Sequence, residues 1–434
     1  MFSEQLRLIR KASGKTQREL AEHLQISAQS VSKWEKGEAL PSIEYLPNMA
    51  NFFGCSINAF FTDVESFDPK HNVYDISKIK STLEIEEKIN SALRHFKLNA
   101  EVKKIHHGVR ILTFVVEMYE GVGITDIKKR EKDLIHFISE ENISFNTDDY
   151  KNNTFAIEIP KKDFNGVPLE SALQSDEYVK SEHTLPIIMG YDRKDNLIIE
   201  DLARLPHMIV AGCPGSGKTT FVRNVIACLT SRFSAEELEL IICDQIGEFA
   251  YAKDIPHTKG NILDTLQGTV DAMTRLADMA VLRYQRFTEL GVRDIEGYNN
   301  VSDEKMSRIV VIIDEFADLM FLNREIESTV ERIARKGRAT GIHVIILSQR
   351  PSLNVFTGLI KASISSRACL HVETAAESKY IFDVAGAENL ALDGDMLYNS
   401  NVAPGSNSKP VRVQVPYITE SELVRKAKRE KSDA

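Results

Sequence analysis

The sequence has few of the features that mark secreted, disulfide-stabilised or membrane-spanning proteins. Its five cysteines are scattered and form no C-x-x-C pair. That pattern fits neither a disulfide framework nor a zinc site, and it suits a reducing cytoplasm. No apolar run approaches the roughly 20 residues needed to span a bilayer, and the N-terminus lacks the basic and apolar stretches of a signal peptide. These absences predict a cytoplasmic chain with no intrinsic membrane segment.

Positive charge is scarce relative to negative charge. Lys and Arg number 54 and Asp and Glu number 63, which gives a net charge of −9 over 434 residues. This balance argues against a protein that binds a polyanion over its whole surface. It is compatible with a basic groove or pore, because the local field matters more than the sum. The length is enough for roughly two to four domains, each with its own core.

The hydrophobic pattern changes along the chain and predicts several domains and connecting segments. Short helices joined by tight turns predict an all-α head, and mixed helical and alternating patterns predict a small α+β subdomain. Beyond it, apolar strand runs alternate with longer helical patterns, which is typical of a parallel α/β sheet. The predicted parts are 1–62 (head), 63–74 (linker), 75–180 (α+β subdomain), 181–420 (α/β domain) and 421–434 (a charged tail expected to fray from Val424 onward).

Two short helices in the head have capping residues at their ends. Thr16 and Glu19 have the spacing of a capping box, Ser27 is a second N-cap, and Gly37 ends the second helix. Two short helices joined by a turn of about three or four residues form a helix-turn-helix. The exposed second helix of such a unit enters the major groove of DNA.

Exposed positions of this head supply candidates for DNA contact. Gln29 and Lys33 would face base edges with Ser30 beside them, and Gln17 would sit at a helix N-terminus facing phosphate. The run Leu6–Phe61 resembles the Cro/repressor-type helix-turn-helix family through T-Q-x-E-L-A, S-x-Q-S-V-S-K-W-E-K-G and the P-S that follows. Such heads usually read double-stranded DNA in pairs, so oligomerisation elsewhere in the chain would be needed. The alternative is a helical module that binds protein.

A phosphate-binding loop is predicted between the apolar run His207–Ala211 and the helical run Thr220–Leu229. It matches G-x-x-x-x-G-K-[ST] in full, at Gly212, Cys213, Pro214, Gly215, Ser216, Gly217, Lys218 and Thr219, and Thr220 directly after it is a further candidate for nucleotide binding. The glycines let backbone N–H groups turn toward phosphates, and the helix N-terminus adds partial positive charge. Lys218 would reach the β- and γ-phosphates of ATP, and Thr219 would offer its hydroxyl to Mg²⁺. A chance match is the alternative, which the strand–loop–helix setting disfavours.

Polar side chains follow two further apolar strands. Asp314 and Glu315 end the run Arg308–Ile313 at the carboxyl edge, where ligands bind in such sheets. Asp314 would hold the Mg²⁺ shell, Glu315 would orient the attacking water, and Gln349 at the end of the next strand would sense the γ-phosphate. The alternatives are an acidic strand end that caps the next helix and a glutamine in a turn. The loop and the carboxylate pair together predict Mg-ATP in a P-loop NTPase with a RecA-like parallel sheet.

Residues 74–420, about four-fifths of the chain, resemble the motor of the FtsK/SpoIIIE family of DNA translocases. The motifs are L-P-H-M-I-V-A-G at Leu205–Gly212, I-P-H at Ile255–His257, V-V-I-I-D-E-F-A-D-L-M at Val310–Met320, G-R-A-T-G-I-H at Gly337–His343, S-Q-R-P-S at Ser348–Ser352, T-G-L-I-K-A at Thr357–Ala362, G-A-E at Gly386–Glu388 and G-D-M-L at Gly394–Leu397. The resemblance implies ATP hydrolysis in a hexameric ring around duplex DNA. It also implies that 75–180 is the α subdomain of the family.

A ring of this kind implies roles for further basic residues. An arginine from one subunit would complete the ATP site of the next and stabilise charge on the transferred phosphoryl group. Arg338 matches the family position best, with Arg350 and Arg367 as alternates. Lys361 is the candidate for a phosphate contact in the pore, which would carry no sequence information. The alternatives are an ordinary surface ion pair for the arginine and a solvated side chain for the lysine.

The sequence departs from the family pattern in ways that bear on the subunit interface. Gln245 follows Asp244 where the family commonly has a lysine, and Lys379 stands where it has an arginine. The membrane segments and winged-helix domain of the cell-division members are not seen, so the head would supply DNA targeting. This arrangement suits plasmid or mobile-element DNA transfer. The rival interpretation is a transcriptional regulator or initiator-like protein whose ATPase fold gates oligomerisation.

Overall fold

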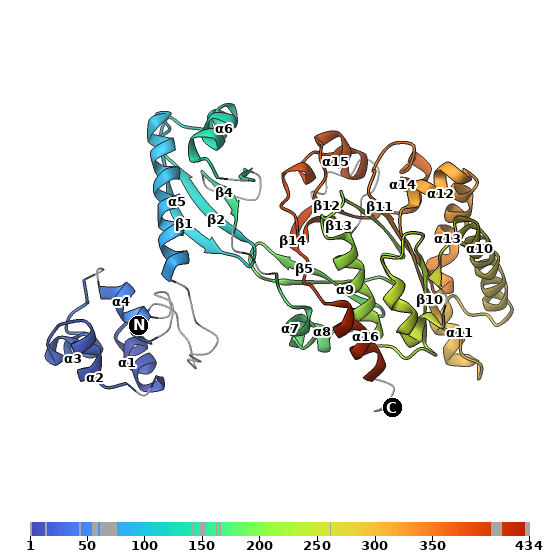
Figure 1. Cartoon of the computed structure of the whole chain (residues 1–434), viewed down its shortest axis with the longest axis horizontal. Helices are drawn as coiled ribbons and strands as arrows, with labels where there is room; N and C mark the ends of the chain where they lie inside the picture. Colours follow the sequence, from blue (N-terminus) through green and yellow to red (C-terminus); the bar gives the residue numbers. More distant parts are fainter. Residues whose placement is uncertain are drawn as a thin grey trace. The chain divides into compact units, whose positions relative to one another are not determined.

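The computed structural model describes residues 2–13, 15–42, 45–53, 60, 76–140, 142–147, 153–161, 164, 166–260, 262–400 and 410–429. The predicted linker, 63–74, and the end of the predicted tail, 430–434, lie outside these residues. The chain forms two compact units (Figure 1). The first unit comprises Met1–Val102 with Met118–Ser139, and the second comprises Lys103–Glu117 with Glu140–Ala434.

The head in the first unit is helical. Its helices are α1 (Phe2–Ala12), α2 (Gln17–His23), α3 (Ala28–Lys36) and α4 (Tyr45–Phe53). The capping box at Thr16 and Glu19 is present in full, and the Ser27 hydroxyl accepts a hydrogen bond from the backbone of α3. Val31 and Trp34 on α3 are buried in the core of the head. The predicted helix-turn-helix is therefore confirmed.

A small sheet accounts for the predicted strands before residue 180. Its order is β1 (Ala100–His107), β2 (Ile111–Met118), β4 (Thr154–Pro160) and β3 (Ser144–Asn146). β4 pairs antiparallel with β2 and with β3, and its side chains from Phe155 to Ile159 are buried. Two helices, α5 (Ile76–His95) and α6 (Ile124–Ile138), contact each other in the first unit. The predicted combination of helices and alternating strands is present.

The second unit is built on a ten-stranded sheet in the order β6-β5-β14-β13-β12-β7-β11-β10-β8-β9. Its strands are β5 (Pro186–Asp192), β6 (Leu197–Asp201), β7 (His207–Ala211), β8 (Leu238–Cys243), β9 (Ile262–Leu263), β10 (Arg308–Ile313), β11 (Ile342–Ser348), β12 (Ser366–Leu370), β13 (Asp395–Asn399) and β14 (Val411–Gln414). Neighbours from β12 to β9 are parallel, as predicted. The pairs from β12 back to β6 are antiparallel, which the alternation of strands and helices did not indicate.

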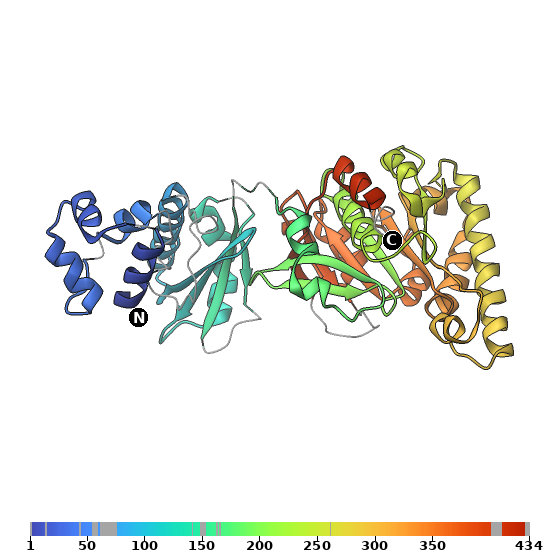
Figure 2. The same cartoon turned by 90° about the horizontal axis from the view of Figure 1, so that it is seen from below.

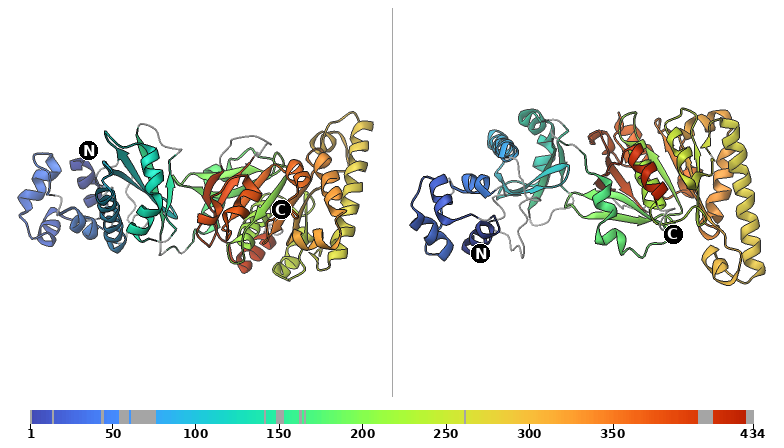
Figure 3. Two further views of the ribbon diagram at one scale, coloured as in Figure 1. Left: turned by 90° about the horizontal axis from the view of Figure 1, so that it is seen from above. Right: turned by 60° about the horizontal axis from the view of Figure 1, so that its bottom comes forward.

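Helices cover both faces of this sheet (Figures 1 and 2). One face carries α9 (Lys218–Thr230) and α16 (Glu420–Arg429), and the other carries α10 (Leu266–Glu289), α12 (Phe316–Leu322) and α13 (Ile326–Thr340). In β7, Val210 packs on the α9 side and Ile209 on the α10 side. Because both faces are buried, the central strands are unbroken apolar runs. α10 and α13 lie side by side (Figure 3). Arg332 of α13 forms an ion pair with Asp278 of α10.

The predicted charged tail is a helix over most of its length. α16 buries Leu423 and Ala427 in the core, and Glu420 at its start forms an ion pair with Arg223 of α9. The expectation of fraying is wrong for 424–429, because two apolar positions four residues apart face α9 and supply the packing that a charged helix lacks alone. A search of the described helices finds none with the length and hydrophobicity that a membrane span requires.

Two short helices before residue 180 also pack against the large sheet. α7 (Leu169–Leu173) and α8 (Asp176–Val179) bury Leu169 and Tyr178 in the same core as α9. The Tyr178 hydroxyl donates a hydrogen bond to the Cys228 carbonyl at 2.7 Å. The boundary placed at 180/181 in the sequence stays a prediction, and these helices contribute their side chains to the core of the larger domain.

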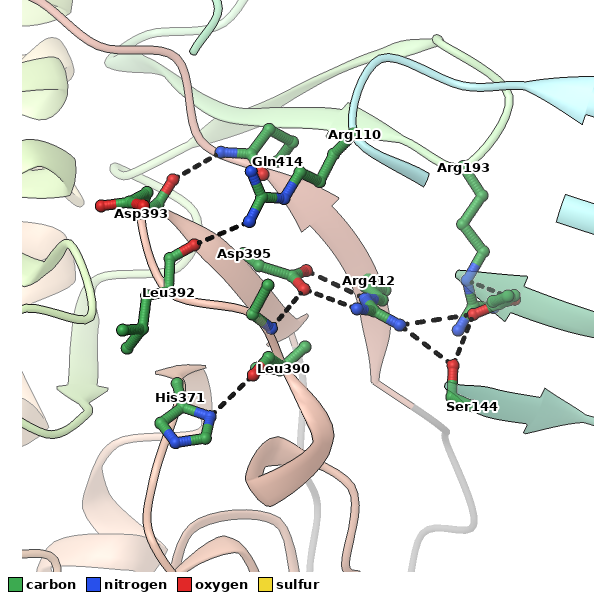
Figure 4. Close-up of polar contacts among 12 residues, drawn as sticks. Arg110, Ser144, Arg193, His371, Leu390, Leu392, Asp393, Asp395, Arg412 and Gln414 are labelled. Atoms are coloured by element: carbon green, nitrogen blue, oxygen red, sulfur yellow. Dashed lines mark hydrogen bonds and ion pairs between the residues drawn. The ribbon is translucent and has the colours of Figure 1, made fainter. Parts of the chain in front are cut away.

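A buried cluster of ion pairs joins the small sheet to the large one within the second unit (Figure 4). Arg412 of β14 donates to Asp395 of β13 at 2.5 and 2.9 Å and to Ser144 at 3.1 Å, and it lies 3.4 Å from Glu158 of β4. Arg193 lies 2.9 Å from the other oxygen of Glu158. Burial alone would lower the pKa of Arg412, but the two carboxylates raise it above its usual value. The cluster therefore remains charged in the folded protein, and removing one of its partners would leave an uncompensated buried charge.

Two buried histidines lie on neighbouring strands of the large sheet. His207 in β7 accepts a hydrogen bond from Val344 N at 3.1 Å, and His343 in β11 lies 3.1 Å from the Pro206 carbonyl. Burial lowers the pKa of His207 to about 4, and burial together with nearby His207 lowers that of His343 to about 3. Both rings are therefore neutral in the folded protein, whereas each is charged below about pH 6.5 in the unfolded chain.

We expect the free energy of unfolding to fall as the pH drops from about 6.5 toward 4, because only the unfolded state then takes up these protons. For His207 the loss approaches about 3 kcal/mol at about 1.4 kcal/mol per pKa unit. Urea unfolding followed by circular dichroism at pH 5.0 and 7.5 measures it. His207→Asn, which keeps an acceptor for Val344 N, should reduce the difference between the two pH values. His136→Asn, at an exposed position, should leave it unchanged. An equal difference in parent and His207→Asn would contradict the assignment.

Candidate functional site

The predicted phosphate loop leaves β7 at Ala211 and enters α9 at Lys218. Gly215 and Gly217 have φ values of +75° and +109°, which side chains other than hydrogen rarely permit. A Cβ on Gly217 would also lie 2.7 Å from the Gly394 nitrogen. Glycine is thus required both by the turn and by the close approach of a second segment. A turn of this shape at the N-terminus of a long helix suits an anion.

Lys218 lies under this loop. It is 7% exposed, and its ammonium donates to the carbonyls of Gly212 at 2.7 Å and Cys213 at 3.0 Å. Burial lowers the pKa of Lys218, while the nearby carboxylates of Asp314 and Glu315 oppose that shift. The ammonium is therefore held by two carbonyls of the loop, and Lys218 also lines the cavity described below.

Asp314 and Glu315 follow β10, and their carboxylates have different surroundings. Burial, with the negative charges of Glu248 and Asp244 nearby, raises the pKa of Asp314 to about 7. One of its oxygens, Oδ2, is buried without a hydrogen-bond partner among the described residues. The ammonium of Lys218 opposes this shift, and a bound cation would add further positive charge beside the carboxylate. The Thr219 hydroxyl donates to Glu248 at 2.6 Å in the same region.

Glu315 is held from both sides of its carboxylate by the end of β11. Ser348 Oγ donates to Oε1 at 2.8 Å, and the backbone N–H of Gln349 donates to Oε2 at 2.9 Å. Glu315 itself has φ +50°, an uncommon value for a residue with a side chain. Strain of this kind persists where the surroundings over-determine the conformation, and it clusters at functional sites. The carboxylate is positioned rather than free to rotate.

Sequence reasoning missed a third carboxylate, Glu248. It lies in the loop after β8, where Asp244 accepts hydrogen bonds from four consecutive backbone N–H groups, Ile246 to Phe249. Asp244 thereby shapes the loop that brings Glu248 to Thr219. The available signal was an acidic residue soon after a strand that neighbours β10, since the carboxyl ends of adjacent parallel strands meet at one edge.

A cavity of about 540 Å³ is lined by Lys218, Thr219 and Glu248. Asp314 and Glu315 lie near Lys218 but are not among the described residues that line it. Its size falls within the roughly 300–1,000 Å³ of small-molecule sites. The residues that line it are Phe164, Gly166, Pro214, Gly215, Gly217, Lys218, Thr219, Thr220, Glu248, Gln349, Asp393, Val415 and Tyr417. The predicted loop and Gln349 thus share one cavity, whereas Phe164, Gly166, Asp393, Val415 and Tyr417 had not been singled out.

The basic residues predicted to act beyond this cavity have varied surroundings. Arg338 on α13 and Arg350 after β11 are exposed, so both can reach another molecule. Arg367 is 3% exposed and donates to the carbonyls of Ile381 and Lys361, which leaves it unsuited to that role. Lys361 is paired with Asp383 at 2.8 Å, and its side chain is 16% exposed. Its contact with DNA stays a prediction and would require that pair to open.

The head presents most of its candidates to solvent. Gln29 and Lys33 on α3 are exposed, and Ser30 is half-buried. Gln17, predicted to face phosphate, donates its side-chain amide to Glu35 at 2.7 Å. Arg10 pairs with the same carboxylate at 2.5 Å. Gln17 therefore also stabilises the fold of the head, and its contact with DNA stays a prediction.

The oxygen donors beside the phosphate loop fit Mg²⁺ bound with a phosphate ligand. Hard divalent cations take oxygen ligands, and Mg²⁺ commonly binds one or two carboxylates together with substrate phosphates and waters. Asp314 has an unpartnered oxygen, Thr219 a hydroxyl, and Glu248 a carboxylate beside them. The predicted ligands Thr219 and Asp314 are thus compatible with the ion, and Glu248 adds a second negative charge.

Comparison with protein families and curated relatives gives consistent results. The profile of the FtsK/SpoIIIE family matches residues 168–353, that of the FtsK alpha domain 63–161, and a helix-turn-helix profile 6–60. DNA translocase FtsK of Haemophilus influenzae is 34% identical over 371 residues, which cover 79% of this chain and 69% of that protein. DNA translocase FtsK of Clostridium acetobutylicum is 32% identical and covers 82% of this chain. The match covers 47% of the Clostridium acetobutylicum protein, so the chain spans about half the length of such relatives.

Solved structures share the fold. One is the pCW3 conjugation coupling protein TcpA in its monomer form with ATPγS, with a TM-score of 0.56, 22% identity, and coverage of 80% of this chain and 99% of that one. Another is the cytoplasmic domain of the type VII secretion ATPase EccC of Thermomonospora curvata, with a TM-score of 0.51, 20% identity, and coverage of 61% and 34%. At these identities the likeness concerns the fold, and the predicted α/β P-loop class is confirmed.

Proposed function

The chain belongs to the FtsK/SpoIIIE family, and from this premise we propose that it is an ATP-driven motor that moves double-stranded DNA. The observation that carries the proposal is the meeting of Lys218, Asp314 and a doubly held Glu315 at one sheet edge. A platform that only bound nucleotide would need the first two groups. A carboxylate fixed from two directions is suited to orienting a reacting water.

The residues at this edge of the sheet would have separate roles in hydrolysis. Lys218 would exchange its two backbone carbonyls for phosphate oxygens of ATP. Thr219 and Asp314 would hold Mg²⁺, which neutralises charge on the phosphates when bound. Each Glu315 oxygen accepts one hydrogen bond from the protein and has a further lone pair for the attacking water. Because the Gln349 backbone donates to Glu315, a change at the γ-phosphate would be felt at the end of β11.

We propose a homo-oligomeric ring, with six subunits as the expected number. Arg338 is exposed on α13 and is absent from the lining of its own cavity among the described residues, so it is free to serve a neighbouring site. An arginine supplied in trans is typically worth about 10³–10⁵ in rate.

We also propose that the helix-turn-helix head selects the DNA on which the motor acts, in plasmid or mobile-element transfer. Support comes from the exposed Gln29 and Lys33 on α3 and from a shared fold with a conjugation coupling protein. A nucleotide-gated regulator uses the same head, so measurements of hydrolysis must separate the two functions.

Long duplex DNA should stimulate ATP hydrolysis by the parent protein, and Lys218→Ala should abolish hydrolysis with and without DNA. The physical reason is that Lys218 contributes the charge that contacts the phosphates. Phosphate release measured with linear duplex of increasing length tests this. Lys259→Ala, at an ion pair outside the cavity lining, is the control. Hydrolysis that DNA does not change, together with tight binding to a single short site, would favour the regulator.

Mixing two inactive variants should restore part of the activity. Lys218→Ala lacks its own phosphate contact, and Arg338→Ala lacks the group it would give to a neighbour. In a mixed ring some interfaces pair an intact Lys218 with an intact Arg338 and hydrolyse ATP. Arg335→Ala, on an exposed position one turn earlier in α13, should retain activity alone. A mixture with no more activity than its components would contradict a site completed in trans.

Gln29→Ala should weaken binding to a cognate duplex and leave ATP hydrolysis without DNA unchanged. A good contact between a side-chain amide and a base edge is worth about 1–3 kcal/mol of discrimination. Anisotropy with short labelled duplexes measures the affinity, once a binding site has been selected from random sequence. Lys218→Ala should show the opposite pattern, with intact binding and no hydrolysis. Loss of basal hydrolysis in Gln29→Ala would contradict this division of labour.

A further inference from the structure

Part of the cavity wall has no role in phosphate or metal chemistry. Phe164, Gly166, Val415 and Tyr417 line the same cavity as Lys218 and Thr219, but they offer aromatic, apolar or backbone surface. This wall adjoins the phosphate loop through the backbone: Gly394 N donates to the Ser216 carbonyl at 2.9 Å, and Val415 N donates to the Gly394 carbonyl at 2.8 Å. A ligand in the cavity would therefore meet charge at the loop and an aromatic surface next to it.

The backbone of Tyr417 is held by hydrogen bonds on both sides, and its ring lines the cavity. Its backbone N–H donates to the Val167 carbonyl at 2.7 Å, and its carbonyl accepts from Leu169 N at 2.8 Å. The side chain is nevertheless 39% exposed. A Cβ at Gly166 would lie 2.7 Å from a ring carbon of Tyr417. The ring thus lies directly on the backbone of Gly166. Glycine is favoured at this position for two reasons: a Cβ would clash with the ring, and the φ of +79° is rare for residues with a side chain.

The ring of Phe164 is in contact with the side chain of Arg110. The guanidinium carbon of Arg110 lies 4.4 Å from the centre of its ring. Arg110 comes from the turn between β1 and β2, and its guanidinium points toward the Leu392 carbonyl and the 392–395 segment (Figure 4). Burial lowers the pKa of Arg110, and the charges of Asp395 and Asp393 oppose that shift. The attraction between this cation and the ring face stabilises the contact of Phe164 with Arg110.

We propose that this wall is the nucleobase subsite, with Tyr417 as the stacking ring and Phe164 as the second aromatic wall. The inference rests on the proposed ATPase function. A planar base carries a π-face that every aromatic ring can stack on, whereas the phosphates need the loop and Lys218. The four wall residues supply ring and apolar surface, so affinity at this wall comes from ring area, while Asp393 and Gln349 line the same cavity. The subsite therefore favours purine over pyrimidine nucleoside triphosphates.

The test compares ATPγS with inorganic tripolyphosphate, a probe that carries the phosphates and no base. Calorimetric titration with Mg²⁺ gives the dissociation constant of each probe for the parent, Tyr417→Ala, Tyr417→Leu and Tyr417→Phe. We expect Tyr417→Ala to raise the ATPγS constant about 5- to 100-fold, the range for loss of a base–aromatic stack. Tripolyphosphate should bind all the variants equally, and Tyr417→Phe should bind ATPγS within about twofold of the parent. Tyr284→Ala, an exposed tyrosine on α10, is the matched control.

Tyr417→Leu keeps apolar bulk and removes the ring, so it separates stacking from packing. We expect it to resemble Tyr417→Ala for ATPγS and to lose the preference of the parent for ATP over CTP. Unchanged ATPγS binding in both variants would overturn the subsite. A parallel loss of tripolyphosphate binding would also overturn it, because Tyr417 would then act by supporting the phosphate loop. A parent that binds neither probe would refute the proposed ATPase function, and the subsite with it.

Discussion

The site depends on three neighbouring parallel strands that end at the same edge of the sheet. β7 pairs with β11 and β11 pairs with β10, and Ala211 lies opposite Ser348 at the end of this register. Two residues after β10, Glu315 therefore comes within reach of the Ser348 hydroxyl and the Gln349 N–H. A shift of one residue in either pairing would turn these side chains to the wrong face of the sheet. The water-orienting role proposed for Glu315 is thus a property of strand register.

What the sequence predicted well is local in the chain. β7, β10 and β11 are continuous apolar runs because both faces of the central sheet are buried. The loop after β7 has a motif whose glycines are required by positive backbone φ angles. The helix-turn-helix is equally local, since the pair Thr16–Glu19 closes its capping box within one turn. These elements need little information about partners far along the chain.

What the sequence did not predict depends on distant partners. β13 and β14 are short and acquire their roles by pairing with β12 and β5, so their number and direction carry no local signal. Glu248 becomes part of the site only because Asp244 folds the loop after β8 back on itself. α16 is too charged to be stable alone, and it is held by the burial of Leu423 and Ala427. Each is a case in which tertiary packing decides a feature that local pattern leaves open.

The antiparallel half of the sheet links the nucleotide cavity to the small sheet. The 393–395 segment contacts the phosphate loop through Gly394, and one residue later Asp395 receives two hydrogen bonds from Arg412. Arg412 in turn reaches Glu158 of β4. Removing one partner of a buried ion pair leaves an uncompensated charge, so such clusters tolerate rearrangement poorly. The phosphate loop, Gly394, Asp395, Arg412 and Glu158 thus form one continuous chain of hydrogen bonds and ion pairs. Gly394 has φ +89° and lies between its hydrogen bonds to Ser216 and Val415, so both contacts of this segment depend on a backbone conformation that glycine adopts readily and other residues rarely do.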